Sequence, residues 1–264
     1  MSSAPERNWS AVTVFDRVVC GVDLGSASRV AARQAAQLVK PAGSLLLVSA
    51  TVGEAVPVAF AGGLGYVRAR TRIDTATRQR YCEALASARY DAVEQFGGTR
   101  IMRVEGEPVP SLLDALGAER ATLAVVGSHE TQRLPGIVLG SVATHVLHKA
   151  DCSVLVARGE WPEGRPHRVI VGVDGSAGAA AALLAARELV DRLGGSLEEL
   201  TDQNPVPALV ASARRDDLIV IGSRELHDPR ALGSVSERVA HRAPCSVLVV
   251  RPPDGVRRAR RNPS

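Results

Sequence analysis

A few small or acidic residues have the types and positions needed to hold an anionic ligand. Asp23 and Gly127 each close a short apolar run, and Gly140 and Ser141 stand just before a predicted helix. The first backbone N–H groups and the dipole of a helix favour a phosphate or a carboxylate. The hydroxyl of Ser141 could cap that helix, and it could also donate to a phosphate oxygen. These residues predict a nucleotide cradle if the fold brings them together.

The pattern occurs twice along the chain. "VGVDGS" at 171–176 repeats the opener "CGVDLG" at 20–25, and "HRAPCSVLVVR" at 241–251 repeats "HKADCSVLVAR" at 148–158. Between these segments, Gly222 stands where the first copy has Gly127. A chain of 264 residues has room for two domains of ordinary size. We therefore expect two related domains in tandem.

Short apolar segments alternate with helical ones, which is typical of an α/β fold with a parallel sheet. The composition, 45% hydrophobic but 3% aromatic, fits strands of Val, Leu and Ile under Ala-rich helices. The predicted fold class is two tandem doubly wound parallel-sheet domains. In the first domain we expect strands near 18–22, 45–49, 99–104, 123–126 and 153–157, and helices near 26–40, 73–96, 109–119 and from 141.

Composition shifts predict the domain boundaries. We expect a flexible arm at 1–14, a first domain at 15–157, a linker at 158–168, a second domain at 169–250 and a basic disordered tail at 251–264. The second domain is shorter, because Asp23 to Pro108 spans 85 positions whereas Asp174 to Pro205 spans 31, so that 54 residues are absent. It should lack one strand and one helix, with a strand near 197–200 left in that region.

The bulk properties disfavour several classes of protein. The net charge of +4 is mild, and no Arg run is interleaved with aromatic residues, so nucleic-acid binding is not expected. No apolar run approaches the roughly 18 residues of a membrane span, and the N-terminus has no signal-peptide pattern. We expect no membrane partner and a cytoplasmic location. The four cysteines have no metal-binding spacing and are expected to be buried thiols.

Other features that could carry chemistry have simpler interpretations. His145 and His148 are spaced i, i+3 on a predicted helix, but the sequence places no third ligand, so capping or surface histidines are favoured over a metal site. "AGGLGY" at 61–66 lacks the Gly-Lys-Ser/Thr of a phosphate-binding loop and predicts a mobile loop. No Ser-His-Asp or Cys-His arrangement stands out. We therefore predict that the protein is not an enzyme.

The repeated motifs resemble the universal stress protein family over about residues 15–251. Nucleotide-binding members carry Gly-x2-Gly-x9-Gly-Ser/Thr after the fourth strand, and this chain has Gly127-x2-Glu130-x9-Gly140-Ser141. The resemblance implies a strand order of 3-2-1-4-5 in the first domain, dimerisation through the last strand, and ATP, which Mg²⁺ could accompany, between the first and fourth strands. Since both copies end in apolar strands, we hypothesise that the two domains pair through these strands as an intrachain pseudo-dimer. A homodimer of chains stays open.

The resemblance also implies roles for individual residues. Asp23 would meet the adenosine, and the end of the second strand near Ala50 would wall the base. The implied nucleotide-binding residues are Asp23, Gly127, His129, Glu130, Gly140, Ser141 and Val142.

Two departures from the family pattern weaken the site. Glu130 replaces a glycine that would let the backbone approach the phosphates, and its charge repels them unless a cation or Arg133 intervenes. In the second copy Glu225 replaces the same glycine, the loop to Gly233 has seven residues rather than nine, and the deletion is expected to remove the wall beside the base. We expect no nucleotide in the second domain.

Two functions follow from the sequence. The leading one is a tandem universal stress protein, a non-enzymatic module that binds or senses an adenine nucleotide (ATP) in stress response through its first domain. The alternative is a nucleotide-free interaction or regulatory protein of the same fold, whose site is weakened by Glu130 and Glu225. An ATP hydrolase is disfavoured, because little beyond Asp23 and Glu130 could orient a water molecule.

Overall fold

A computed structural model describes residues 15–51, 56–60, 63–67, 75–128, 139–223 and 235–251; within 52–75 it describes backbone alone. Five residues named above lie outside the described residues: His129, Glu130, Arg133, Glu225 and Gly233. The expected arm at 1–14 and residues 252–264 of the tail lie outside them as well. Among the described residues, no helix combines the length and the apolar character needed to cross a membrane.

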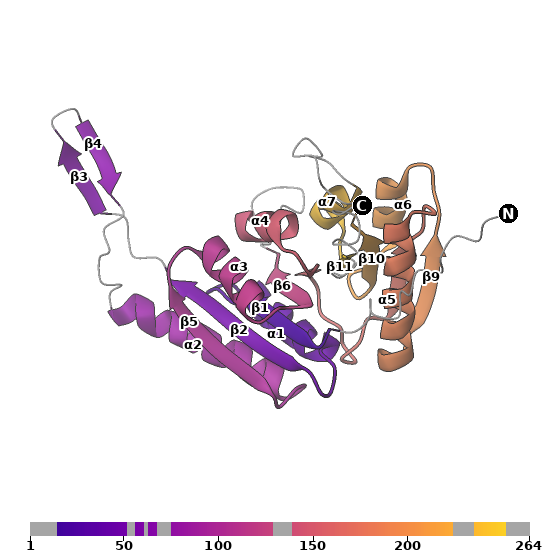
Figure 1. Cartoon of the computed structure of the whole chain (residues 1–264), viewed down its shortest axis with the longest axis horizontal. Coiled ribbons are helices and arrows are strands. Elements are labelled where there is room, and N and C mark those ends of the chain that lie inside the picture. The colour runs from indigo at the N-terminus through magenta and orange to yellow at the C-terminus, as the bar shows by residue number, and fades with distance from the viewer. Residues whose placement is uncertain are drawn as a thin grey trace, which may run out of the picture.

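The described residues form one nine-stranded sheet with helices on both faces, and a separate two-stranded sheet (Figure 1). The first half contains β1 (Arg17–Gly21), α1 (Ala27–Leu38), β2 (Ser44–Thr51), β3 (Val56–Phe60), β4 (Gly63–Val67), α2 (Thr75–Val93), β5 (Thr99–Glu105), α3 (Pro108–Ala118), β6 (Leu123–Gly127), α4 (Ser141–Lys149) and β7 (Ser153–Ala157). The second half contains β8 (Arg168–Gly172), α5 (Ala177–Leu193), β9 (Ser196–Leu200), α6 (Pro205–Ser212), β10 (Leu218–Gly222), α7 (Val235–Arg242) and β11 (Ser246–Val250).

The strand order of the large sheet is β5-β2-β1-β6-β7-β11-β10-β8-β9. Its first five strands confirm the predicted order 3-2-1-4-5. The second half repeats this order in mirror sense without the outermost strand, because β9 lies beside β8 as β2 lies beside β1, and no described strand corresponds to β5. Within each half the neighbouring strands are parallel.

Alternation along the strands divides the apolar side chains between two cores. In β1, Val18 and Cys20 belong to the core beneath α1, α2 and α5, whereas Val19 belongs to the core beneath α3, α4, α6 and α7. The period of two in a strand sends successive side chains to opposite faces. Each strand therefore contributes to both cores, and each core runs through both halves.

The two halves are joined by an antiparallel pair of strands at the centre of the sheet. Residues Val154–Val156 of β7 pair with Val247–Val249 of β11. Both strands are buried along their whole length. The predicted pairing of the halves through their last strands is therefore confirmed, and neither strand leaves an edge open to another chain.

Arg158, the residue after β7, reaches into the second half. Its backbone N–H donates to the Ser246 hydroxyl at 2.9 Å, and its guanidinium donates to the carbonyl oxygen of Ala243 at 3.0 Å. Ala243 directly follows α7, so the cation lies at the negative end of the helix dipole.

Arg251, the residue after β11, makes the reciprocal contacts with the first half. Its backbone N–H donates to the Ser153 hydroxyl at 3.0 Å. Its guanidinium donates to the carbonyl oxygens of Leu147 and Ala150 at the end of α4. We call these two arginines, with Ser153 and Ser246, the arginine clasp. Each half thus holds the last helix of the other.

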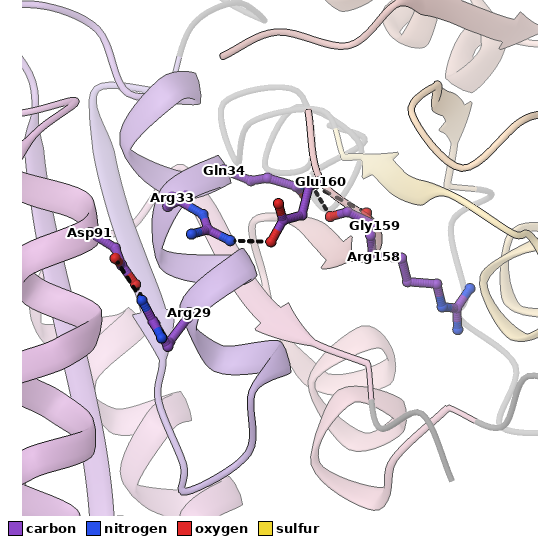
Figure 2. A network of polar contacts seen from close by, with 7 residues as sticks. All are labelled: Arg29, Arg33, Gln34, Asp91, Arg158, Gly159 and Glu160. Atoms are coloured by element: carbon purple, nitrogen blue, oxygen red, sulfur yellow. Dashed lines mark hydrogen bonds and ion pairs between the residues drawn. The ribbon is translucent and has the colours of Figure 1, made fainter. Parts of the chain in front are cut away.

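Helix α1 extends the contact between the halves through a buried glutamine (Figure 2). The side-chain amide of Gln34 donates to the carbonyl oxygens of Arg158 and Gly159, each at 3.2 Å. The Ser246 hydroxyl lies 2.8 Å from the Gln34 side-chain oxygen. Because Gln34 is only 2% exposed, these polar groups depend on one another for hydrogen bonds.

Two arginines that precede this glutamine on α1 form ion pairs, as Figure 2 shows. Arg33 contacts Glu160 after β7 at 2.5 Å, and Arg29 makes a bidentate contact with Asp91 of α2 at 2.6 and 3.1 Å. In each pair one partner is shielded and the other exposed: Asp91 is buried beside the exposed Arg29, and the half-buried Arg33 contacts the exposed Glu160.

The prediction of a mobile loop at 61–66 is wrong, because most of this segment belongs to a strand. Strand β4 begins at Gly63 and pairs antiparallel with β3, from Phe60↔Gly63 to Val56↔Val67. Two β-prone segments separated by two residues are a hairpin signal, which the glycine-rich motif obscured. The hairpin stands away from the large sheet (Figure 1).

Replacing Ser246 with alanine should lower the free energy of unfolding by about 1–3 kcal/mol, because the Arg158 N–H loses its acceptor inside a buried interface. Urea unfolding followed by circular dichroism measures the change. In the matched control, Ser212→Ala removes only a partly buried bond to Leu209 within one helix and should cost about 1 kcal/mol or less. An equal loss in the two variants would contradict the role of the clasp.

Candidate functional site

The fold creates two topological switch points, one in each half. After β1 the chain turns to α1 on one face of the sheet, and after the neighbouring β6 it turns to α4 on the opposite face. In the second half β8 leads to α5 and β10 leads to α7 in the same way. Ligands of open α/β sheets bind at such points, outside the carboxyl ends of the strands.

Asp23 follows β1 at the first switch point, where its carboxylate shapes the turn into α1. The carboxylate accepts hydrogen bonds from the backbone N–H of Gly25 at 2.8 Å and from the Ser28 hydroxyl at 2.6 Å. The Ser28 hydroxyl also accepts from the Asp23 N–H at 2.9 Å. The side chain is exposed, so it is held in place while remaining accessible to a ligand.

Gly127 ends β6 beside the start of α1. A Cβ at this position would lie 2.8 Å from the carbonyl oxygen of Ala27, closer than real Cβ contacts. In the second half a Cβ on Gly222 would lie 2.2 Å from the carbonyl group of Gly178. Both glycines therefore let a strand end and a helix start approach closely.

Gly140, Ser141 and Val142 lie at the start of α4, on the other side of the first switch point. Gly140 is the N-cap residue, with its carbonyl oxygen accepting from Thr144 N–H at 2.9 Å, and no side chain caps the helix. The expected capping role of Ser141 is therefore wrong, because Ser141 is already the first helical residue. Its hydroxyl is exposed, and the first turn of α4 holds no acidic residue.

The second switch point contains a pocket with a volume of about 400 Å³. The last residues of three strands, Gly172 of β8, Leu200 of β9 and Gly222 of β10, line it. Its other lining residues are Val173, Asp174, Ser176, Ala179, Asp202, Gln203, Asn204, Pro205, Leu209, Ile221, Val235, Ser236 and Arg238. We call this the second-half pocket.

The expectation that the deletion removes the wall of this pocket is wrong. Val173 N–H donates to Leu200 O at 2.9 Å, as Val22 N–H donates to Val48 O at 2.8 Å in the first half. Strand β9 therefore takes the place of β2, and the missing strand is the outer neighbour, which does not reach the switch point. Counting residues revealed the length of the deletion but not which strand it removed.

Sequence reasoning also missed Asp202 and Asn204. Position 202 stands two residues after Leu200, as Ala50 stands two residues after Val48. Extending the match of Gly43-Ser44-Leu45 with Gly195-Ser196-Leu197 would have shown that the second half carries a carboxylate where the first has alanine.

His148 and His241 lie between the last helices of the two halves, whereas the ring of His145 contacts the Ser141 carbonyl oxygen of its own helix at 2.7 Å. His148 Nε2 lies 3.2 Å from a carboxylate oxygen of Glu237 on α7, and His241 Nε2 lies 4.0 Å from the same oxygen. Burial lowers the pKa of His241, although Glu237 partly opposes this effect. Among the residues that the structure describes, no group of three His, Cys, Asp or Glu side chains could hold a metal ion.

The family model described as the universal stress protein family matches residues 15–158 and 198–251. The chain belongs to this family. It is 28% identical over 200 residues to a universal stress protein of Mycobacterium tuberculosis (strain ATCC 25618 / H37Rv). The alignment covers 56% of this chain and 67% of that protein.

Solved structures share the fold of this universal stress protein over most of its length. One from Archaeoglobus fulgidus DSM 4304 is 19% identical, with a TM-score of 0.66, and the match covers 89% of this chain and 98% of that one. A putative universal stress protein from Pseudomonas aeruginosa UCBPP-PA14 is 12% identical, with a TM-score of 0.63 and coverage of 92% and 96%. These similarities support the two-domain fold.

Replacing Gly222 with alanine in this universal stress protein should destabilise it by about 1–3 kcal/mol, because the new methyl group meets the backbone of α5. Gly117→Ala in α3 is the control, since a Cβ there meets nothing within 4 Å, and it should stabilise the protein by up to about 1 kcal/mol. Melting temperatures measure both changes. A stabilised Gly222→Ala variant would contradict the close approach.

The expectation of four buried thiols is wrong for two of them, because Cys20 and Cys245 are buried whereas Cys82 and Cys152 are half-buried. Thiol reactivity tests these environments. Burial raises the pKa of Cys152 to about 11 and that of Cys245 to about 12, and raises the pKa of the fully buried Cys20 as well. These three thiols stay protonated at pH 8, so only the half-buried Cys82 should react rapidly with a disulfide reagent, whereas all four react after unfolding. A second rapid thiol in the native Cys82→Ser variant would contradict this assignment.

Proposed function

We propose that the first half binds an adenine nucleotide, with ATP as the ligand, and that the protein is a non-enzymatic binding module in stress response. The observation that supports this most is the first switch point itself, because Asp23 follows β1, Gly127 ends the neighbouring β6, and the helix that begins at Ser141 is the one that follows β6. An exposed carboxylate fits a ribose hydroxyl. The N-terminus of α4, which has no acidic residue in its first turn, fits the phosphates. Mg²⁺ would accompany the phosphates.

Charge supports the proposal that ATP binding is confined to the first half. The second-half pocket is lined by Asp174 and Asp202, and the first turn of α7 carries Glu237. Only Arg238 supplies a positive side chain among the residues that line this pocket. A triphosphate at this position would approach more negative charge than at the start of α4.

The second half then serves as a permanent partner for the first. We propose domains at 15–157 and 169–250, linked by 158–168, that form an intrachain pseudo-dimer. The β7–β11 pairing and the arginine clasp support this proposal. The cytoplasm is the proposed location.

Calorimetric titration of the full chain with ATP and Mg²⁺ tests the nucleotide site. We expect one ATP per chain, and the Asp23→Ala variant should bind about tenfold more weakly because the ribose loses a charged acceptor. The control Asp114→Ala removes an exposed carboxylate on α3 and should leave the affinity unchanged. An Asp23→Ala variant that binds ATP as tightly as the unaltered protein would contradict the assignment.

The variant Glu130→Gly distinguishes this function from the alternative. Removing the charge at this sequence position should tighten ATP binding several-fold, since like-charge repulsion near a surface is about 1–4 kcal/mol. If neither the natural chain nor this variant binds ATP, a nucleotide-free interaction or regulatory protein of the same fold is the better description.

A further inference from the structure

The second-half pocket differs in chemistry from the first switch point. Asp174 follows β8 and Asp202 follows β9, so two carboxylates stand after adjacent parallel strands. Each is held by a turn: Asp174 accepts from Ser176 N–H at 3.0 Å, and Asp202 accepts from Asn204 N–H at 2.7 Å. The first half has only Asp23 in this arrangement, because Ala50 occupies the position of Asp202.

The shortened connection shapes the pocket. In the first half, β2 is followed by the β3–β4 hairpin, α2 and β5 before α3 begins at Pro108. In the second half α6 begins at Pro205, five residues after β9 ends at Leu200. The deletion therefore connects β9 directly to α6, and residues of this short connection, Asp202, Gln203 and Asn204, line the pocket together with Pro205.

Most of the other residues that line the pocket are apolar, and the exceptions are Ser176, Ser236 and the single cation Arg238. Leu200, Leu209, Ile221 and Val235 line it, together with Ala179. These side chains can cover the faces of an aromatic base, while the amides of Gln203 and Asn204 can donate to and accept from its edge.

The volume limits the size of the ligand. A pocket of about 400 Å³ lies near the lower end of the roughly 300–1,000 Å³ of small-molecule sites. Paired carboxylates favour hydroxyl donors and repel phosphates, since an ionised carboxylate only accepts hydrogen bonds.

We propose that the second-half pocket binds a nucleoside without phosphates, with Asp174 and Asp202 accepting hydrogen bonds from the ribose hydroxyls. This proposal rests on the proposed function for the choice of a nucleoside. The chain then has two unlike sites: a triphosphate site in the first half and a nucleoside site in the second.

Calorimetric titration of the full Asp23→Ala chain with adenosine tests the second-half pocket separately from the first. We expect one adenosine per chain, and ATP should not displace it, because ATP binds in the first half alone. Adding Asp202→Asn should weaken adenosine binding about tenfold, because the amide keeps the turn to Asn204 but loses the charged acceptor. The control Asp191→Asn, on the exposed side of α5, should bind adenosine normally.

The probe 2′,3′-dideoxyadenosine, which keeps the base but lacks both ribose hydroxyls, should bind at least about tenfold more weakly than adenosine. Equal binding of the two compounds, an unchanged affinity in Asp202→Asn, or no adenosine binding would overturn the proposal. The two hypotheses fail separately. ATP binding that depends on Asp23 without any adenosine binding would leave the proposed function intact, whereas adenosine binding without ATP binding would leave only the second-half site.

Discussion

The pairing of β7 with β11 is the constraint on which the rest of the molecule depends. Each half of the sheet would otherwise expose an apolar strand, and edges of this kind associate with other chains. The antiparallel pairing gives both strands hydrogen-bond partners. It joins a five-stranded unit and a four-stranded unit into one sheet. The arginine clasp fixes its register, because each arginine must meet the helix end of the opposite half.

The junction also explains why a reduced second half can be stable. The loss of a strand and a helix removes material from the outer edge of the sheet, whereas the contacts between the halves lie at its centre. The core beneath α1, α2 and α5 continues across the junction, and so does the core on the opposite face. Apolar contacts with the first half can therefore stabilise the second half.

The sequence predicted most of the elements, since alternating apolar segments and glycine-terminated strands are local signals. The strand order came from the family resemblance. Sequence reasoning missed two features that depend on the register between distant segments: β9 occupies the position of β2, and Asp202 lines the same pocket as Asp174. Gly127 shows another limit. The sequence does not distinguish a strand-end glycine that approaches a phosphate from one that approaches the backbone of Ala27. The structure shows the second role for Gly127.

The arginine clasp has a consequence for how such a protein can diverge. In an assembly of two identical chains, one change in the gene alters both copies of a binding site. Here the two copies are encoded separately but stay physically joined, so Ala50 and its counterpart Asp202 could become different without disturbing the junction. Covalent linkage turns a symmetric architecture into a scaffold that can acquire two distinct specificities.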